Sequence, residues 1–210
     1  MSPIPDTGCE HRDMAKLILA SASPRRKELL TQAGFSYQVH PAHIPEDPYP
    51  GEDPLSYVLR LAREKAEAAY SQLLAAAPQP EPFHILGADT TVTIDGQILA
   101  KPDDRADAAR MLALLSGRTH QVITGVALLT HTPSAPPVVN VAAETTSVQF
   151  LPISPEEIAA YVGTGEPMDK AGAYAIQGRA ARWIPRIEGC YFNVVGLPLS
   201  LVSRMIHSAR

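Results

Sequence analysis

Residues 17–26 constrain the fold more than any other stretch of this chain. They begin with an apolar run, residues 17–20, which has the length of one buried strand. Small residues follow, and then Ser23 and Pro24, a pair typical of a helix N-cap with proline in the first turn. The stretch therefore predicts a buried strand that leads directly into a helix.

Two arginines, Arg25 and Arg26, fall in the first turn of that helix. The N-terminal end of a helix dipole is positive and favours acidic side chains, so cations are disfavoured there. Free backbone N–H groups, the dipole and two guanidinium groups at one point would together hold an anion, above all a phosphate. The alternative is that both arginines are solvated on an exposed helix, and the stretch by itself leaves this open.

Composition narrows the classes of partner. The chain has 210 residues, enough for one domain or for two lobes around a cleft. A net charge of −4 argues against nucleic acid as a partner and leaves a small anionic ligand open. The two cysteines, Cys9 and Cys190, lack metal-site spacing, which indicates a reducing compartment, the cytoplasm. No apolar run reaches the length of a membrane span, so no membrane partner is expected.

The domain organisation is predicted to be simple. Residues 1–16 contain prolines, a glycine and acids but no apolar core of a signal peptide, so we expect a disordered N-terminal extension. Residues 17–210 are expected to form a single domain.

Periodicity predicts alternating strands and helices. The expected helices are 26–34, 54–77, one that starts at Lys101-Pro102 and closes at Ser116-Gly117, 155–162 and 196–208. The expected strands are 17–20, 35–40, 83–88, a hairpin over 92–98, an antiparallel pair 121–130 and 138–150, and a short strand at 173–176. This order predicts an α/β fold, a mixed sheet with flanking helices.

Asp89 and Lys65 are the first candidates for chemistry. Asp89 directly follows the predicted strand 83–88, where α/β folds place ligands. A carboxylate there can bind a divalent cation or accept a proton from water, or it can simply cap the next turn. Lys65 lies at the edge of the apolar stripe of helix 54–77, so its amine either enters a neighbouring cleft or is solvated.

Lys101 and Gln177 complete the set. Lys101 precedes a proline at a strand-to-helix junction, a position that suits a phosphate ligand but also an ordinary surface lysine. Gln177 follows a segment rich in glycine and charge, and its amide offers the donor and acceptor that suit a nucleobase edge. The alternative is a tight loop in which Asp169 and Lys170 pair with neighbours at the surface. Several cations, a carboxylate and a base reader together favour a polyphosphate ligand with a metal.

Six sequence blocks resemble the Maf family of nucleoside triphosphate pyrophosphatases. They are LASASPRR (19–26), LGADT (86–90), KP (101–102), LSG (115–117), GEPMDKAGAY (165–174) and NVVGLP (193–198), in the order of the family. The resemblance implies an inosine-triphosphatase-like fold with two lobes around a deep cleft, and a homodimer. It also implies a divalent metal, Mg²⁺ or Mn²⁺, and hydrolysis of a nucleoside triphosphate to monophosphate and pyrophosphate.

The block DKAGAYAIQ (169–177) is similar to the dTTP/UTP pyrophosphatase branch of the family. The methylated-GTP branch has no lysine after the aspartate and carries an acid in place of Gln177. Carried over by motif, Asp89 is the proton acceptor, and Arg25, Thr90 and Gln177 stand at positions tied to substrate choice. The resemblance places four further residues against phosphate: Ser21, Arg26, Lys65 and Lys101.

The resemblance leaves Asp89 and Glu46 as the candidate metal ligands. The family often carries an acidic pair before the long helix, and here only Glu46 of that pair remains. Two rival functions stay open at this point. One is a pyrophosphatase for modified nucleotides such as methylated GTP. The other is a non-catalytic nucleotide-binding regulator of cell division, because the family has been linked to septum formation.

Overall fold

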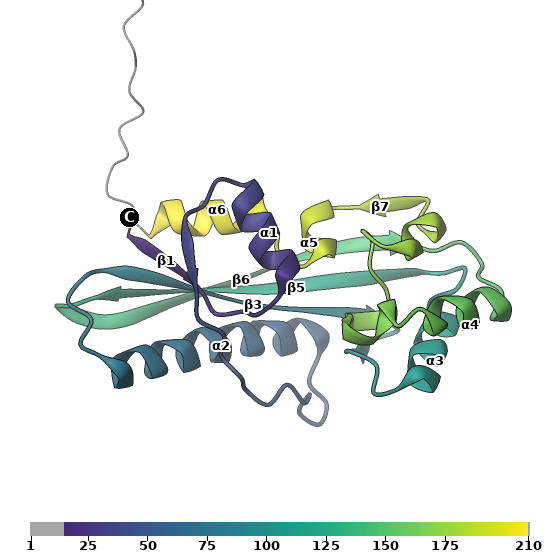
Figure 1. The fold of residues 1–210 in the computed structure, drawn as a ribbon, viewed down its shortest axis with the longest axis horizontal. Coiled ribbons are helices and arrows are strands. Elements are labelled where there is room, and N and C mark those ends of the chain that lie inside the picture. The colour runs from purple at the N-terminus through teal and green to yellow at the C-terminus, as the bar shows by residue number, and fades with distance from the viewer. Residues whose placement is uncertain (1–14, 210) are drawn as a thin grey trace, which may run out of the picture.

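The computed structural model describes residues 15–209, which form a seven-stranded sheet with helices on both faces (Figure 1). The strand order is β2-β1-β3-β5-β6-β7, and β4 pairs with β3. β1 is parallel to β2 and to β3, and the remaining pairs are antiparallel. This mixed sheet with flanking helices confirms the predicted α/β class.

Strands and helices alternate early, and short helical segments follow later. The strands are β1 (Lys16–Leu19), β2 (Tyr37–Val39), β3 (Phe83–Ile94), β4 (Gln97–Leu99), β5 (Thr119–Thr132), β6 (Ala135–Gln149) and β7 (Arg186–Glu188). The α-helices are α1 (Pro24–Gln32), α2 (Pro54–Ala76), α3 (Arg105–Leu115), α4 (Pro155–Gly163), α5 (Tyr191–Val195) and α6 (Leu199–Ser208). Three 3₁₀ helices are η1 (Glu166–Asp169), η2 (Ala171–Ala173) and η3 (Arg179–Trp183).

The predicted strand-to-helix unit at the start of the fold is confirmed as β1 and α1. Ser23 is the N-cap of α1, and its hydroxyl accepts a hydrogen bond from the backbone N–H of Arg26. Lys16, expected in the extension, is instead the first residue of β1. Residues 1–14 of the predicted extension lie outside the described residues.

Helix α2 lies directly on the sheet because two glycines of neighbouring strands let it approach. A Cβ atom at Gly87 of β3 would lie 2.2 Å from the Ala62 carbonyl oxygen, and one at Gly125 of β5 would lie 2.3 Å from that of Val58. The predicted apolar stripe of this helix is largely buried. Leu55, an apolar residue of this helix, is 45% exposed, because it lies in the first turn, beyond the sheet contact.

Strand β3 corrects the expected place of Asp89. The strand was expected to end at residue 88, but it continues to Ile94 because β5 pairs with it from Phe83 to Thr93. Asp89 is therefore in the interior of β3. Its parallel neighbour β1 ends at Leu19, opposite Leu86, so Asp89 lies just past the carboxyl end of β1 rather than of its own strand.

Two other predicted elements are wrong. The helix expected from Lys101 begins at Arg105, because Asp104 caps it by accepting from the backbone N–H of Asp107. The strand expected at 173–176 does not form. Gly172 and Ala173 have positive φ angles of 66° and 58°, which interrupt an extended backbone at the start of this stretch, and residues 176–178 form a turn.

Among residues 15–209, the apolar core consists of four clusters of buried side chains, and two of them, around Ala66 and Val58, lie between α2 and the sheet. Of the other two, one includes Leu112, Tyr161 and Trp183 under α3 and α4, and the other includes Leu29 and Val202 under α1 and α6 (Figure 1). Within residues 15–209, no helix combines the length and the apolar character that crossing a bilayer requires.

Candidate active site

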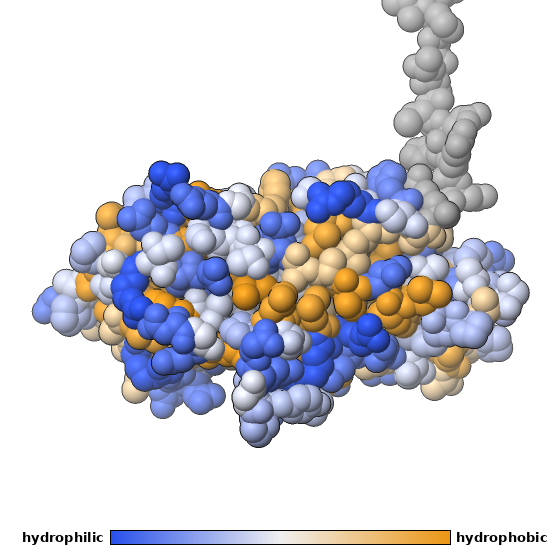
Figure 2. All heavy atoms as spheres, turned by 180° about the vertical axis from the view of Figure 1, so that it is seen from behind, coloured by the Kyte–Doolittle hydropathy of each residue, from blue (hydrophilic) through white to orange (hydrophobic). Residues whose placement is uncertain are grey.

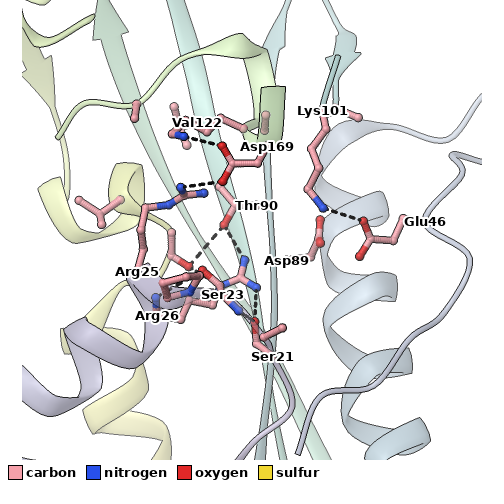
Figure 3. A pocket seen from close by; sticks show the side chains of 18 of the residues that line it. Ser21, Ser23, Arg25, Arg26, Glu46, Asp89, Thr90, Lys101, Val122 and Asp169 are labelled. Atoms are coloured by element: carbon pink, nitrogen blue, oxygen red, sulfur yellow. Dashed lines mark hydrogen bonds and ion pairs between the residues drawn. The ribbon is translucent and has the colours of Figure 1, made fainter. Parts of the chain in front are cut away.

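A cavity of about 400 Å³ lies beside strand β3, which lines it with Asp89, Thr90 and Val92 (Figure 3). Its walls come from the β1–α1 loop, the loop before α2, the strand β3 and the segment that follows α4. Every residue that the sequence marked for substrate, metal or catalysis lines it: Ser21, Arg25, Arg26, Glu46, Lys65, Asp89, Thr90, Lys101 and Gln177. The fold thus brings together residues from distant parts of the chain.

Asp89 and Glu46 share one ammonium group. Lys65 Nζ lies 2.7 Å from Asp89 Oδ1 and 2.6 Å from Glu46 Oε1. Lys65 and Asp89 are buried, at 7% and 8% exposed. The close contact of α2 with β3 fixes the Lys65–Asp89 pair. The Lys65 amine therefore enters the cavity, which is the first of the two alternatives that the sequence left open.

The two carboxyl groups differ in their acidity. Burial raises the pKa of the Asp89 carboxyl above its ordinary value, against the opposing effect of Lys65 and Arg26. Half-burial also acts to raise the pKa of Glu46, but Lys65 and Lys101 outweigh it, so the pKa of Glu46 lies below its usual range. Asp89 is consequently the better proton acceptor of the two, because its conjugate acid is the weaker one.

The loop that carries Glu46 is fastened to α2 by residues that the sequence reasoning missed. The Tyr57 hydroxyl donates to the Glu46 carbonyl oxygen at 2.8 Å, and Arg60 Nη2 donates to that of Asp47 at 3.2 Å. Arg60 also donates to both carboxylate oxygens of Glu52 at 2.7 Å. Only the spacing of Tyr57 and Arg60 on one helix could have indicated this role.

Arg26 connects three walls of the cavity. Its guanidinium donates to the carbonyl oxygens of Gly196 and Ala88, both at 2.9 Å. It also donates to Ser21 Oγ at 3.2 Å and to Thr90 Oγ1 at 3.1 Å. At 9% exposed, Arg26 is not the solvated arginine of the alternative interpretation. Its positive charge remains at the cavity wall, but most of its donors bind the protein.

Arg25 points across the mouth of the cavity toward Asp169 (Figure 3). Arg25 Nη1 lies 3.6 Å from Asp169 Oδ2, and both side chains are accessible, at 32% and 69% exposed. Lys170 Nζ contacts the same aspartate at 2.5 Å, as the surface-pairing alternative for this loop expected. Such exposed ion pairs are weak, so an anionic ligand would compete for Arg25 at little cost.

Gln177 and Lys101 occupy the outer part of the cavity lining. Both side chains are exposed, and Lys101 Nζ lies 3.6 Å from Glu46 Oε2. Thr90 lies deeper and shares a hydrogen bond of 2.9 Å with the hydroxyl of Thr124 on β5. The sequence reasoning missed Thr124, because a threonine within a strand carries no signal of its own.

The donor set fits a divalent cation of the kind that the family resemblance implies. Oxygens of Glu46 and Asp89 converge on the single Lys65 ammonium, so the two carboxylates face a common space. Mg²⁺ is commonly bound by one or two carboxylates together with substrate phosphates. Within the described part of the chain, no cluster of three or more His, Cys, Asp or Glu side chains that could hold a metal ion is present.

A family model described as Maf-like protein matches residues 16–209. The chain belongs to the Maf family. Among curated proteins, the dTTP/UTP pyrophosphatase of Koribacter versatilis is 55% identical over 92% of this chain and 94% of that protein. The dTTP/UTP pyrophosphatases of Geobacter metallireducens and Moorella thermoacetica are 51% and 50% identical, over 88% and 92% of this chain and 91% and 94% of those proteins.

Solved structures give weaker matches to this Maf chain. The Staphylococcus aureus Ham1 protein aligns over 93% of this chain and 100% of its own, with a TM-score of 0.45 and 12% identity. The nucleoside-triphosphatase / dITP/XTP pyrophosphatase of Mycobacterium abscessus aligns over 63% of this chain and 74% of its own, with a TM-score of 0.38 and 19% identity. TM-scores below 0.5 do not establish a shared topology, so the inosine-triphosphatase-like topology stays a prediction.

Proposed function

We propose that this Maf chain hydrolyses dTTP and UTP to the nucleoside monophosphate and pyrophosphate, which removes unwanted nucleotides from the cellular pool. The observation that carries the proposal is the buried Asp89 carboxylate in a cavity lined by Arg25, Arg26, Lys65 and Lys101. A polyphosphate chain is the ligand whose charge such a lining would balance. The names of the curated relatives support thymine and uracil as the bases.

Asp89 is the proposed proton acceptor. Water attacks the α-phosphorus in line with the leaving group, one water proton passes to the Asp89 carboxylate, and the α–β anhydride bond breaks to release pyrophosphate. The raised pKa of Asp89 makes it a stronger base at neutral pH than an ordinary aspartate. No covalent intermediate is required, because positioning and charge stabilisation supply most of the catalysis of phosphoryl transfer.

The cations of the cavity have distinct proposed roles. Lys65 orients the carboxylates of Asp89 and Glu46 between which it lies. Arg25 and Lys101, which are more exposed, bind the phosphate oxygens where negative charge develops. Ser21 and Arg26 form the wall against which the phosphates lie, and their mutual hydrogen bond keeps that wall in place.

Glu46 and Asp89 would hold the divalent cation, Mg²⁺ or Mn²⁺, together with the substrate. When bound, such a cation supplies a Lewis acid that offsets charge on the phosphate oxygens. Lys101 stays beside Glu46 and limits the negative charge of this group of side chains before substrate binds.

Base choice is assigned to Gln177, with Arg25 and Thr90 beside the sugar and the phosphates. Gln177 offers one acceptor and an NH₂ donor, and the edge of uracil or thymine presents the complementary N–H and carbonyl groups. The small neighbours Ala171 and Ala175, which also line the cavity, leave room for the methyl group of thymine.

A nucleotide panel with Mg²⁺ or Mn²⁺ tests the proposal. Incubation with dTTP, UTP, CTP, GTP and methylated GTP, followed by product identification, should give pyrophosphate and monophosphate fastest from dTTP and UTP. Fastest turnover of methylated GTP would replace the proposed substrate with the rival one. Tight binding without turnover would support the regulator instead, and release of orthophosphate would contradict cleavage at the α–β bond.

We also propose that the protein is a cytoplasmic homodimer without a nucleic-acid partner. The net charge of −4 supports the absence of nucleic acid. A band of apolar side chains crosses the face opposite to that of Figure 1, as Figure 2 shows, and exposed apolar patches often mark protein interfaces. Light scattering coupled to size exclusion should give twice the mass of the chain, 22.6 kDa, and the monomer mass would refute the dimer.

A further inference from the structure

Glu166, the first residue of η1, ties together segments on either side of the cavity-lining loop. Its Oε1 accepts hydrogen bonds from the Tyr161 hydroxyl at 2.9 Å and from the backbone N–H of Arg179 at 3.0 Å. Its own carbonyl oxygen accepts from Lys170 Nζ at 2.7 Å. Burial and the bond to Glu166 raise the pKa of the Tyr161 hydroxyl, so it remains a donor. The carboxylate thus joins α4 to the backbone just after Gln177.

Glycine at position 178 allows the Glu166 carboxylate to approach the backbone closely. Its φ of −104° and ψ of −159° form an extended backbone that other residues adopt as well. A Cβ atom on Gly178, however, would lie 1.8 Å from Glu166 Oε1 and 2.7 Å from Glu166 Cδ. The requirement for glycine therefore comes from the Glu166 carboxylate and not from backbone strain.

Gln177 depends on this backbone contact for its position. Within residues 15–209, no other residue forms a hydrogen bond with its side-chain amide, so side-chain partners do not hold it. Its place in the cavity lining is set by the backbone on either side. Two hydrogen bonds hold the C-terminal side: the turn bond from Gly178 N–H to the Ala175 carbonyl oxygen at 3.1 Å, and the bond from Arg179 N–H to Glu166, which alone among the described residues ties this backbone to another segment. Glu166 itself does not line the cavity.

We propose that Glu166 is a positioning residue for base selection. Its carboxylate holds the Gly178–Arg179 backbone so that the Gln177 amide meets the edge of a pyrimidine base at a fixed distance. The proposal rests on the proposed function, in which Gln177 contacts the base. It extends that function to a residue that touches neither the base nor the phosphates.

Kinetics of Glu166→Ala, Gly178→Ala and the double variant test the proposal. Each single change should lower the UTP-to-CTP ratio of kcat/KM by about tenfold, because the hydrogen bonds between Gln177 and the base are then misplaced. The loss should come from a higher KM for UTP at nearly unchanged kcat, as expected when uniform binding is removed. The double variant should lose no more than either single one, since both remove the same contact.

Glu157→Ala is the matched control. Glu157 is also a glutamate of this lobe whose carboxylate accepts hydrogen bonds, from the Ser154 N–H at 3.0 Å and from Trp183 Nε1 at 3.3 Å, but it does not touch Gly178. Glu157→Ala should lower thermal stability and leave the UTP-to-CTP ratio unchanged. Glu166→Gln, which keeps an acceptor oxygen, should retain more of the ratio than Glu166→Ala.

Amide exchange at Arg179, measured by NMR on the free protein, separates this proposal from the proposed function. Exchange should be faster by about tenfold or more in Glu166→Ala and unchanged in Glu157→Ala. Unchanged exchange in Glu166→Ala would overturn the positioning role, even in a protein that hydrolyses no pyrimidine triphosphate. Faster exchange with an unchanged UTP-to-CTP ratio in an active enzyme would overturn the role in base selection.

Discussion

At the scale of single residues, Asp89 carries the largest expected effect. The carboxylate is buried, contacts one ammonium and lines the cavity, so an amide in its place keeps the shape but cannot accept a proton. Asp89→Asn should reduce kcat by about 100-fold or more, the usual contribution of a general base. Steady-state pyrophosphate release measures this loss.

The control for Asp89→Asn is Asp95→Asn, the same change at an exposed turn residue with φ of 53°, which asparagine tolerates. This variant should keep full activity. Circular dichroism should show both variants folded. Near-normal turnover by Asp89→Asn would remove Asp89 from the mechanism.

Gln177 is expected to control which base is accepted. Gln177→Glu replaces the amide donor with a second acceptor, so the hydrogen bond to a uracil carbonyl is lost and repulsion takes its place. The kcat/KM for UTP and dTTP should fall by about tenfold or more relative to that for GTP. Competition assays with paired nucleotides measure this ratio, and an unaltered preference would exclude Gln177 as the reader.

At the scale of elements, the contact of α2 with β3 determines where Lys65 lies. The structure predicts that Gly87→Ala destabilises the fold by about 1–3 kcal/mol, because the new Cβ meets the backbone of Ala62 at 2.2 Å and the helix must move. Urea unfolding measures the loss.

Gly163→Ala is the control for Gly87→Ala, since a Cβ at Gly163 meets nothing within 4 Å. It should leave the free energy of unfolding nearly unchanged or raise it slightly. Equal stability of the two variants would mean that α2 does not need the glycine contact.

At the scale of the whole molecule, His120 makes stability depend on pH. Burial lowers the pKa of His120 from 6.5 to about 4, and its Nε2 is 2.7 Å from the Tyr174 hydroxyl. The unfolded chain therefore binds a proton more readily, so stability is complete above pH 6.5 and falls as the pH drops toward 4. The loss should reach about 2–3 kcal/mol at pH 4.5.

Urea unfolding of wild type and His120→Gln at pH 7 and pH 4.5 measures the contribution of this histidine. The variant should lose less stability on acidification than wild type by that amount. An equal loss in both proteins would show that His120 does not titrate in the unfolding transition.

Local features of the sequence predicted much of the fold and the members of the site. Ser23 and Pro24 marked the start of α1, and the predicted helix 155–162 is confirmed as α4, where the structure adds a capping box of Ser154 and Glu157. The apolar stripe of α2 and the long antiparallel pair followed from periodicity. The sequence also indicated the residues that line the cavity, because the charge types that suit a polyphosphate were visible in short blocks.

The sequence did not predict what depends on pairing between distant segments. It ended β3 at residue 88, since the pairing of β5 along the whole strand is invisible locally. It also predicted a strand at 173–176, because an alanine gives no local sign of the positive φ angle that Ala173 adopts.

The sequence by itself determined which residues were candidates for the site and which family the chain resembles, because both are visible in short ordered blocks. Only the tertiary structure decided that Arg26 contacts three walls of the cavity, that Lys65 lies between two carboxylates and that Glu166 accepts a hydrogen bond from the backbone N–H of Arg179. These are contacts between residues far apart in the chain, and their geometry is set by the close packing of the helices against one sheet.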